Sequence, residues 1–366
     1  MSAPLLEYFG QRGITLLGLG DGAMVPLRFS DRIAEHRAVR RACGLFDFSF
    51  LGCIELSGRG SLAFLHRLQT RNLSRLAEGR LAYTLLLRPD GTVLNDATVW
   101  RLGAERYCLF VGRCADVAYI NSLAAGDPVS FADRSSDQAI IAVQGRHAWE
   151  TIARCLSGVP AALPYYAFAS ARFEDAECIV ARLGYSGDTC YELVLDVSRG
   201  ATLWRALLNA GAVYDIAECG FEAANSLRIE AGHILFTHEL TAPVTPYDLG
   251  FTRLLDFYRE PAIGMLALRA RRWEESRQRL VGLLIDGELP PAAGTGRTDV
   301  LLPAEGTARV TSACRSPMFG RVVALGFVSA ADRHPGTHVK LIGGGRARVS
   351  RLPFYDPARF LARRVR

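Results

Sequence analysis

The sequence predicts an α+β protein that ends in a separate all-β domain. Up to about residue 270, segments with apolar residues at helical spacing alternate with short β-rich segments. Beyond that point only short strands separated by Pro and Gly follow, which is typical of a small antiparallel barrel or sandwich. A chain of 366 residues also exceeds the roughly 250–300 at which a single core stops growing, so more than one domain is expected.

Helices are predicted where apolar spacing meets residues that cap or stop a helix. A helix capped by Ser30 is expected to stop at Gly44, and a second begins near Ser61. Further helices are predicted from residue 148 onward, at 201–209 and at 218–232.

Strands are predicted where apolar and β-branched residues cluster between turn signals. Before residue 270 these segments are 53–56, 81–87, 92–101, 106–111, 139–143, 178–183 and 191–196. A tight turn at Asp90-Gly91 joins the second to the third, so 81–111 is expected to form an antiparallel meander. The last two segments are expected to pair through the turn at 184–187.

The composition changes at an arginine- and glutamate-rich run, 269–279, which predicts a linker or a solvated helix. The strands expected in the C-terminal domain are 280–285, 308–312, 321–328, 338–342 and 347–352.

Composition favours a soluble protein of a reducing compartment. No apolar stretch approaches the roughly 20 residues that span a bilayer, and the N-terminus lacks the pattern of a signal peptide. Nine cysteines without paired spacing do not suggest a disulfide framework. We therefore expect a cytoplasmic location and no membrane partner.

Lys340 is the only lysine, and this limits the chemistry that the chain can support. A Schiff-base lysine and a phosphate-loop lysine each require an ammonium group in a suitable motif, and Lys340 lies in an apparent strand. Pyridoxal phosphate and Walker-type nucleotide use are therefore not expected. No aromatic-interleaved basic run or finger spacing is present, so nucleic acid is not an expected partner.

Three apparent motifs do not fit their usual sites. The run Gly18-Leu-Gly20 resembles a dinucleotide fingerprint, but Pro26 leaves no room for the helix that should follow. The segment 184–187 lacks the second spacer of a hydrolase elbow. Thr237-His238-Glu239 has no second histidine at helical spacing, so no metal site is predicted. No flavin domain is evident either.

Other short motifs recur along nearly the whole chain in a consistent order. They are EHRAVR at 35–40, GLFDFS at 44–49, FLHRLQT at 64–70, GTVLND at 91–96, QG at 144–145, GYSGD at 184–188, LRIEAG at 227–232 and TPYDLG at 245–250. In order and spacing they resemble the glycine cleavage T-protein (aminomethyltransferase) superfamily.

The resemblance implies an α+β fold of three domains in a ring around a central folate channel, closed by a C-terminal antiparallel β-barrel. Residues 1–270 would form the folate-binding region. Its two interleaved α+β domains would divide roughly into 1–52 with 137–270, and 53–136. Residues 278–366 would form the barrel. The implied function is an enzyme, a tetrahydrofolate-dependent transferase that moves an aminomethyl, methylene or methyl group to tetrahydrofolate.

The resemblance also implies site residues. Asp96 takes the catalytic role, and the residues implied at folate are Glu192, Arg228, Tyr185 and Tyr83. The pterin edge presents a 2-amino group beside N3–H, which suits a carboxylate such as Glu192. A buried carboxylate at Asp96 could handle the proton at the reacting nitrogen. Structural alternatives stay open. Asp96 could cap a turn, the tyrosines could be core residues, and Arg228 could pair with Glu230 or Glu222 on one helix.

Several positions depart from the family pattern, and they bear on the one-carbon donor. Leu51, Gly112 and Phe236 stand where substrate-pocket residues are expected. The donor is then either a lipoyl protein that carries an aminomethyl group or a small methylated molecule. The alternatives are a tetrahydrofolate-dependent O-, S- or N-demethylase and a non-catalytic folate-binding module.

Overall fold

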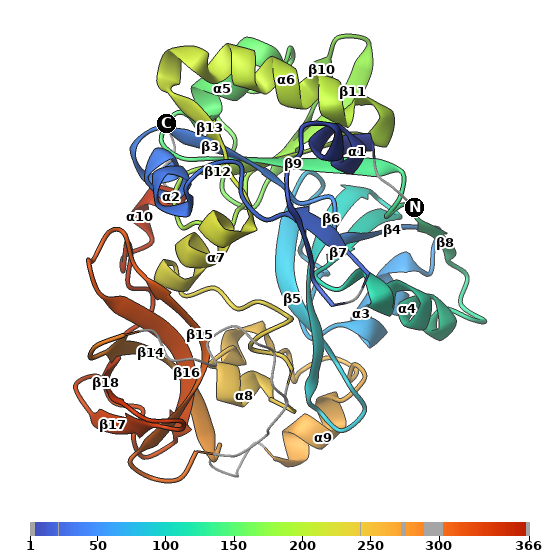
Figure 1. The fold of residues 1–366 in the computed structure, drawn as a ribbon. Coiled ribbons are helices and arrows are strands. Elements are labelled where there is room, and N and C mark those ends of the chain that lie inside the picture. The colour runs from blue at the N-terminus through green and yellow to red at the C-terminus, as the bar shows by residue number, and fades with distance from the viewer. Residues whose placement is uncertain (1–3, 21, 242, 272–275, 289–302, 364–366) are drawn as a thin grey trace.

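Two β-sheets and a closed barrel form the framework of the protein (Figure 1). The computed structural model describes residues 4–20, 22–241, 243–271, 276–288 and 303–363. Among these residues no helix is both long and apolar enough to cross a membrane.

The five-stranded sheet has the order β5-β6-β7-β4-β8 and is antiparallel throughout. Its strands are β4 (Gly52–Ser57), β5 (Leu81–Leu87), β6 (Val93–Gly103), β7 (Arg106–Val111) and β8 (Ser130–Asp133). The meander predicted at 81–111 is confirmed as β5, β6 and β7, whereas β8 was not predicted. One face packs on α3 (Ser61–Leu68) and α4 (Val117–Leu123).

The six-stranded sheet has the order β10-β11-β12-β9-β3-β13. Its strands are β3 (Cys43–Asp47), β9 (Gln138–Gln144), β10 (Phe168–Phe173), β11 (Ala176–Ala181), β12 (Cys190–Asp196) and β13 (Ile216–Glu218). The predicted pairing through the 184–187 turn is confirmed as β11 with β12. The helices α1 (Pro4–Gln11), α5 (Ala148–Cys155) and α6 (Gly200–Gly211) cover one face (Figure 1).

The other face of this sheet packs toward the five-stranded sheet through a shared apolar layer. Phe46 of β3 and Val194 of β12 lie in this layer with Trp100 of β6 and Phe110 of β7. Two helices, α2 (Arg32–Arg41) and α7 (Phe221–Glu230), add residues to it. The layer places side chains of β12 opposite those of β6, and the candidate site lies there.

The limits predicted for the first helix were wrong at both ends. Asp31, not Ser30, is its N-cap, since the Asp31 side chain accepts hydrogen bonds from the Ile33 and Ala34 N–H groups. Gly44 is not a helix stop but lies within β3. A Cβ atom there would lie 2.6 Å from Val39 Cγ2, so close helix–strand packing explains this glycine.

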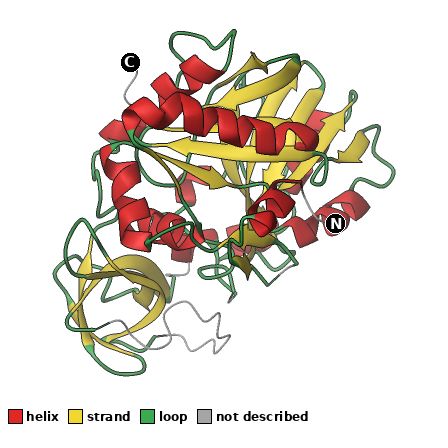
Figure 2. Ribbon diagram, turned by 45° about the horizontal axis from the view of Figure 1, so that its top comes forward, coloured by secondary structure: helices red, strands yellow, loops and turns green. Residues whose placement is uncertain are grey.

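The C-terminal domain is a closed five-stranded barrel in the order β14-β16-β15-β17-β18 (Figure 2). Its strands are β14 (Gln278–Ile285), β15 (Thr307–Arg315), β16 (Val322–Ser329), β17 (His338–Leu341) and β18 (Arg346–Ser350). The predicted barrel is confirmed. The prediction that all of its strands pair antiparallel was wrong at one strand pair, because β15 and β17 run parallel. Lys340 lies in β17, as expected.

Short elements connect these parts. The hairpin β1 (Leu16–Gly18) with β2 (Met24–Pro26) occupies the apparent dinucleotide motif, so no helix follows it. The helices α8 (Pro246–Leu249) and α9 (Met265–Ala270) precede the barrel, and α10 (Phe360–Arg363) ends the described chain. The predicted linker or helix at 269–279 falls partly outside the described residues. The division of 1–270 into two interleaved domains stays a prediction.

Candidate functional site

Tyr83 and Asp96 meet across neighbouring strands of the five-stranded sheet. The Tyr83 hydroxyl donates a hydrogen bond to Asp96 Oδ2 over 3.0 Å. Leu85 is the register partner of Asp96, so Tyr83 reaches the carboxylate diagonally from two residues away. Burial raises the pKa of Asp96, and the Tyr83 hydroxyl lowers it in part. The carboxyl group therefore takes up a proton more readily than a solvated aspartate, which suits acid–base chemistry.

A glycine allows Asp96 to approach an aromatic ring. The Gly112 N–H donates to the Asp96 carbonyl oxygen over 3.2 Å. A Cβ atom at Gly112 would lie 3.0 Å from Asp96 Oδ1 and 3.0 Å from Phe236 Cδ1. Any side chain at this position must displace the carboxylate or the ring. The structure thus brings together one predicted catalytic residue and two predicted substrate-pocket residues.

Glu192 is a buried carboxylate without a partner in the described part of the chain. It lies in β12 between Ala142 of β9 and Ala181 of β11, and it is 8% exposed. No hydrogen bond or ion pair joins its oxygens to any residue that the structure describes. Val194, on the same face of β12, belongs to the apolar layer, so Glu192 faces the sheet that carries Asp96. Its acceptor oxygens are available to a ligand.

The raised pKa of Glu192 predicts a pH dependence of folding. Burial raises this pKa from 4.5 to about 7, so the folded state holds a proton that the unfolded state has lost between these values. The stability of the wild type therefore falls as the pH rises through this window. Glu192→Gln stays neutral, so we expect its free energy of unfolding to exceed that of the wild type by about 3 kcal/mol at about pH 8. Urea unfolding checks this. A difference that is equally large at about pH 4 contradicts it.

Tyr185 packs against a neutral histidine beside the same layer. Its ring stacks on His233 with centroids 5.7 Å apart, and His233 Nδ1 lies 3.1 Å from the Tyr185 carbonyl oxygen. Burial lowers the pKa of His233 to about 4, and the positive charge of Arg359 acts in the same direction. Burial raises the pKa of Tyr185, and the charge of Asp96 adds to this effect. Tyr185 and Asp96 therefore lie within electrostatic reach of each other.

Arg228 is fully buried in α7, where protein groups occupy its guanidinium. Nη1 forms an ion pair with Glu239 over 2.8 Å, and Nη2 donates to Ser312 Oγ of β15 over 2.6 Å. The alternative pairing with Glu230 or Glu222 was wrong, because the partner comes from the loop beyond the helix. A role at folate stays a prediction. The contacts of Arg228 favour a structural role, in which its side chain holds α7 against the barrel.

Leu51 lies at the apolar layer between the two sheets. It is half-buried and packs on the apolar layer that contains Phe48 and Tyr185. The Phe48 and Tyr185 rings meet edge to face with centroids 6.4 Å apart. The structure therefore joins Tyr83 to Asp96 by a hydrogen bond and packs Tyr185 and Leu51 against one apolar layer.

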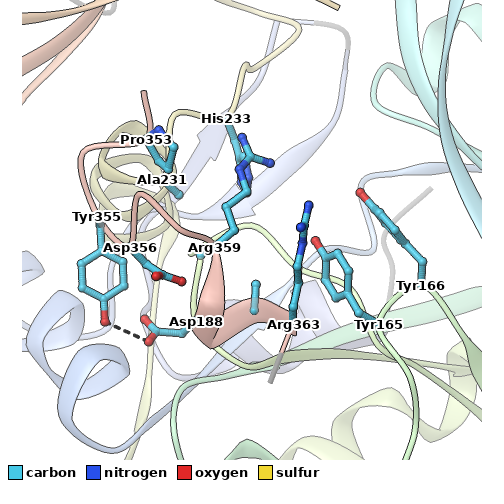
Figure 3. Close-up of a pocket in the computed structure, with 13 residues that line it drawn as sticks. Tyr165, Tyr166, Asp188, Ala231, His233, Pro353, Tyr355, Asp356, Arg359 and Arg363 are labelled. Carbon is cyan, nitrogen blue, oxygen red and sulfur yellow. Dashed lines mark hydrogen bonds between the residues drawn. The ribbon is translucent and has the colours of Figure 1, made fainter. Parts of the chain in front are cut away.

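A pocket opens beside this layer where the C-terminal segment returns to the six-stranded sheet (Figure 3). Its volume is about 550 Å³ including the space at its mouth, and Tyr166, His233, Arg359 and Arg363 are among its lining residues. His233 is the stacking partner of Tyr185. Burial raises the pKa of Tyr83, and the charge of Asp96 acts in the same direction. The pocket thus adjoins Tyr185 through His233, and none of the predicted site residues is among its lining residues.

Sequence reasoning missed the residues that line this pocket. They reach it because the C-terminal segment is attached to α7 and α2. The Phe354 and Tyr355 N–H groups both donate to the Glu230 carbonyl oxygen over 2.9 Å. The Arg40 guanidinium lies 3.6 Å from the Tyr355 ring centroid, and the Tyr355 hydroxyl donates to Asp188 (Figure 3). Gly184, Gly187, Asp188 and Ala231 belong to the GYSGD and LRIEAG motifs, and the signals for the other lining residues were a tyrosine pair at 165–166 and a basic C-terminus, neither of which is specific.

Two family models match the chain over most of its length. The model described as GCVT N-terminal domain matches residues 17–259. The model described as glycine cleavage T-protein C-terminal barrel domain matches residues 278–356. The chain therefore belongs to the glycine cleavage T-protein family, and the family predicted from its motifs is confirmed.

Curated relatives similar to this chain are named aminomethyltransferase. The protein from Bacillus subtilis (strain 168) is 31% identical over 363 residues, covering 96% of this chain and 98% of the relative. That from Moorella thermoacetica (strain ATCC 39073 / JCM 9320) is 34% identical, covering 96% and 97%. The crystal structure of glycine cleavage system aminomethyltransferase T from Bartonella henselae shares the fold. Its TM-score is 0.81 at 24% identity, and the match covers 97% of this chain and 98% of that one.

Proposed function

We propose that this chain is a transferase of the aminomethyltransferase type that moves a one-carbon unit to tetrahydrofolate. Family membership and the aminomethyltransferase relatives support the reaction class. One observation carries the folate site on this chain: the carboxylate of Glu192, which is buried and has no partner among the described residues.

The chemistry of Glu192 fits a pterin edge. The 2-amino group and N3–H of the pterin are neighbouring donors, and an ionised carboxylate accepts from both through its two oxygens. The pKa of Glu192, raised by burial to about 7, shows that ionisation is costly without such donors. Two hydrogen bonds from a bound pterin would favour the ionised form. Aromatic side chains of the same layer, such as Phe48 and Tyr185, supply flat surfaces against which a ring can pack.

Asp96 is the residue that we propose for proton handling. Tetrahydrofolate supplies the nucleophilic N5 that accepts the one-carbon unit. Asp96 Oδ2 is held by the Tyr83 hydroxyl, while Oδ1 faces the space beside Gly112 and Phe236. One oxygen is therefore fixed by the protein and the other can hold a proton or a cationic donor. The apolar Phe236 ring limits water at this oxygen.

The pocket at the C-terminal segment suits the acidic tail of folate. Arg359 and Arg363 line it, and neither forms an ion pair with a residue that the structure describes. Carboxylates of a glutamate tail are the natural counter-ions for such guanidinium groups.

Arg359→Gln tests this placement of the tail. We expect the variant to bind tetrahydrofolate about threefold to tenfold more weakly, because an ion pair that is partly exposed to solvent contributes only a modest binding free energy. Its affinity for tetrahydropteroate, which lacks the glutamate, should stay at the wild-type level. Calorimetric titration of both ligands checks the prediction. Equal losses for both ligands would place Arg359 outside the tail site.

The donor is either an aminomethyl group on a lipoyl protein or a small methylated molecule. The relatives' name favours the first. The second is favoured by the apolar Phe236 and the side-chain-free Gly112, which shape the space beside Asp96. Incubation with tetrahydrofolate and each donor separates them. If only aminomethylated lipoyl protein yields 5,10-methylene-tetrahydrofolate and ammonia, the donor is protein-borne. If a methoxy, methylsulfonium or N-methyl compound yields 5-methyl-tetrahydrofolate, the chain is a demethylase.

A cytoplasmic location is part of this proposal. All nine cysteines are free thiols, and the Cys53 and Cys108 sulfurs share a hydrogen bond over 3.4 Å without forming a disulfide. Free thiols at this density are usual in reducing compartments.

A further inference from the structure

The outer face of the β17–β18 hairpin carries a ladder of basic side chains. His338 stands opposite Arg348 and Lys340 opposite Arg346 in the cross-strand register. All four are exposed, while the residues between them are buried in the barrel. We call these four residues the cationic ladder. Like charges directly opposite each other destabilise a sheet, so the Lys340–Arg346 pair is unfavourable within the hairpin.

The ladder continues into a shallow hollow at the end of β18. Ser350 is the next outward residue after Arg346 and Arg348, and it lines this hollow with Arg279, Arg333 and Arg351. No acidic residue is among those that line it. Burial lowers the pKa of Arg279, and the nearby charge of Arg333 adds to this, so the guanidinium groups crowd one another.

The ladder cations have no ion-pair partner among the described residues, whereas several other exposed arginines do. Lys340, Arg346, Arg348 and Arg351 form no ion pair with any residue in the described ranges. Asp286 donates its N–H to the Arg346 carbonyl oxygen but does not pair with the side chain. Elsewhere on the surface, ion pairs join Arg12 to Glu218, Arg67 to Asp127, Arg106 to Glu55, Arg199 to Asp175 and Arg315 to Glu288.

The whole C-terminal region shares this imbalance. Residues 278–366 contain fourteen of the 43 Lys and Arg residues but only six of the 37 Asp and Glu residues. The net positive charge of this region alone exceeds the +6 of the complete chain, so the remainder is slightly acidic. Such an uneven distribution steers an oppositely charged partner toward one face.

We propose that the cationic ladder and its hollow form a docking surface for an acidic protein. Neighbouring ladder positions lie roughly 5–7 Å apart, close to the spacing of carboxylates at i and i+4 on a helix face. Residues 333–352 contain no Phe, Trp or Tyr, so the surface lacks the aromatic platforms on which single-stranded nucleic acid stacks. This inference goes beyond the folate reaction and does not depend on it.

The test uses the full chain and a labelled helical peptide that carries glutamates at i, i+4 spacing. We expect the peptide to bind, and its glutamine counterpart not to bind, with affinity that falls as salt increases. The double variant Arg346→Gln/Arg348→Gln should bind at least about tenfold more weakly by fluorescence anisotropy. The matched control, Arg59→Gln/Arg75→Gln, changes the net charge equally at two exposed positions outside the barrel and should bind as wild type.

A second variant separates docking from a structural role. Lys340→Glu places a carboxylate opposite Arg346, so we expect its Tm to rise while peptide binding falls. A Tm that falls together with binding would contradict the proposal. So would a control double variant that loses as much affinity as the ladder variant. Tighter binding of single-stranded DNA or of phosphatidylglycerol vesicles through the same arginines would replace the acidic protein with that partner.

Discussion

Asp96→Asn should retain the fold and folate binding but lose about 10²–10⁴-fold in turnover. The amide preserves the shape of the side chain and its contact with the Tyr83 hydroxyl, which can still donate to the amide oxygen. It removes both the negative charge and the proton acceptor in the space beside Gly112 and Phe236. Single-turnover rates with the donor identified by the product assay measure the loss. Wild-type turnover in the variant would show that Asp96 is structural.

Tyr83→Phe provides the graded control for this result. The Tyr83 hydroxyl lowers the pKa of Asp96, so its removal should raise that pKa further. Suppose that the ionised carboxylate is the active form. As the pH decreases, the variant then loses activity sooner, at a higher pH, than the wild type does. The acid limb of the pH–rate profile should therefore move to higher pH. An unshifted limb would separate Tyr83 from the chemistry of Asp96.

Glu192→Gln should weaken tetrahydrofolate binding roughly 10- to 150-fold, which corresponds to about 1.5–3 kcal/mol for a hydrogen bond to a charged group. The glutamine keeps one acceptor oxygen but presents an N–H₂ group to a pterin edge that itself donates. Glu192 has no partner among the described residues, so the substitution breaks no contact within them. The loss should therefore appear in binding, measured by calorimetry, and not in the integrity of the fold.

Glu177→Gln is the matched control on the neighbouring strand. Glu177 lies in β11, is exposed, and undergoes the same change of charge. Its affinity for tetrahydrofolate should match the wild type. If both variants lose affinity equally, the effect comes from net charge and Glu192 is not at the pterin.

Local patterns predicted the elements whose contacts are close in sequence. The 81–111 meander and the β11–β12 pair were recovered because a short turn joins each pair of strands. The strand β3 was missed because it is short and its neighbours come from far along the chain, with β9 on one side and a parallel β13 on the other. The parallel pairing of β15 with β17 in the barrel was missed for the same reason, because these strands are not consecutive in the sequence.

The site residues were predicted at positions where a family motif coincides with a local chemical need, and their roles at folate stay predictions. Tyr83 and Asp96 are thirteen residues apart in sequence, and strand pairing brings them together. The partner of Arg228 was wrong because Glu239 becomes its neighbour only through the loop that follows α7. The pocket arginines escaped notice because the C-terminal segment returns to the six-stranded sheet through contacts that no local pattern encodes. These are the bonds to Glu230 and the Arg40–Tyr355 stack.

We propose that the buried carboxylate of Glu192 accepts hydrogen bonds from the pterin edge. The most direct measurement is a double-mutant cycle by calorimetry, with wild type and Glu192→Gln each titrated with tetrahydrofolate and with its 2-desamino analogue. We expect the analogue to bind the wild type more weakly than tetrahydrofolate does. The substitution should then cost little further affinity, because the donor that it affects is already absent. If the substitution weakens binding of the analogue as much as binding of tetrahydrofolate, Glu192 does not contact the 2-amino group, and the proposed folate site is wrong.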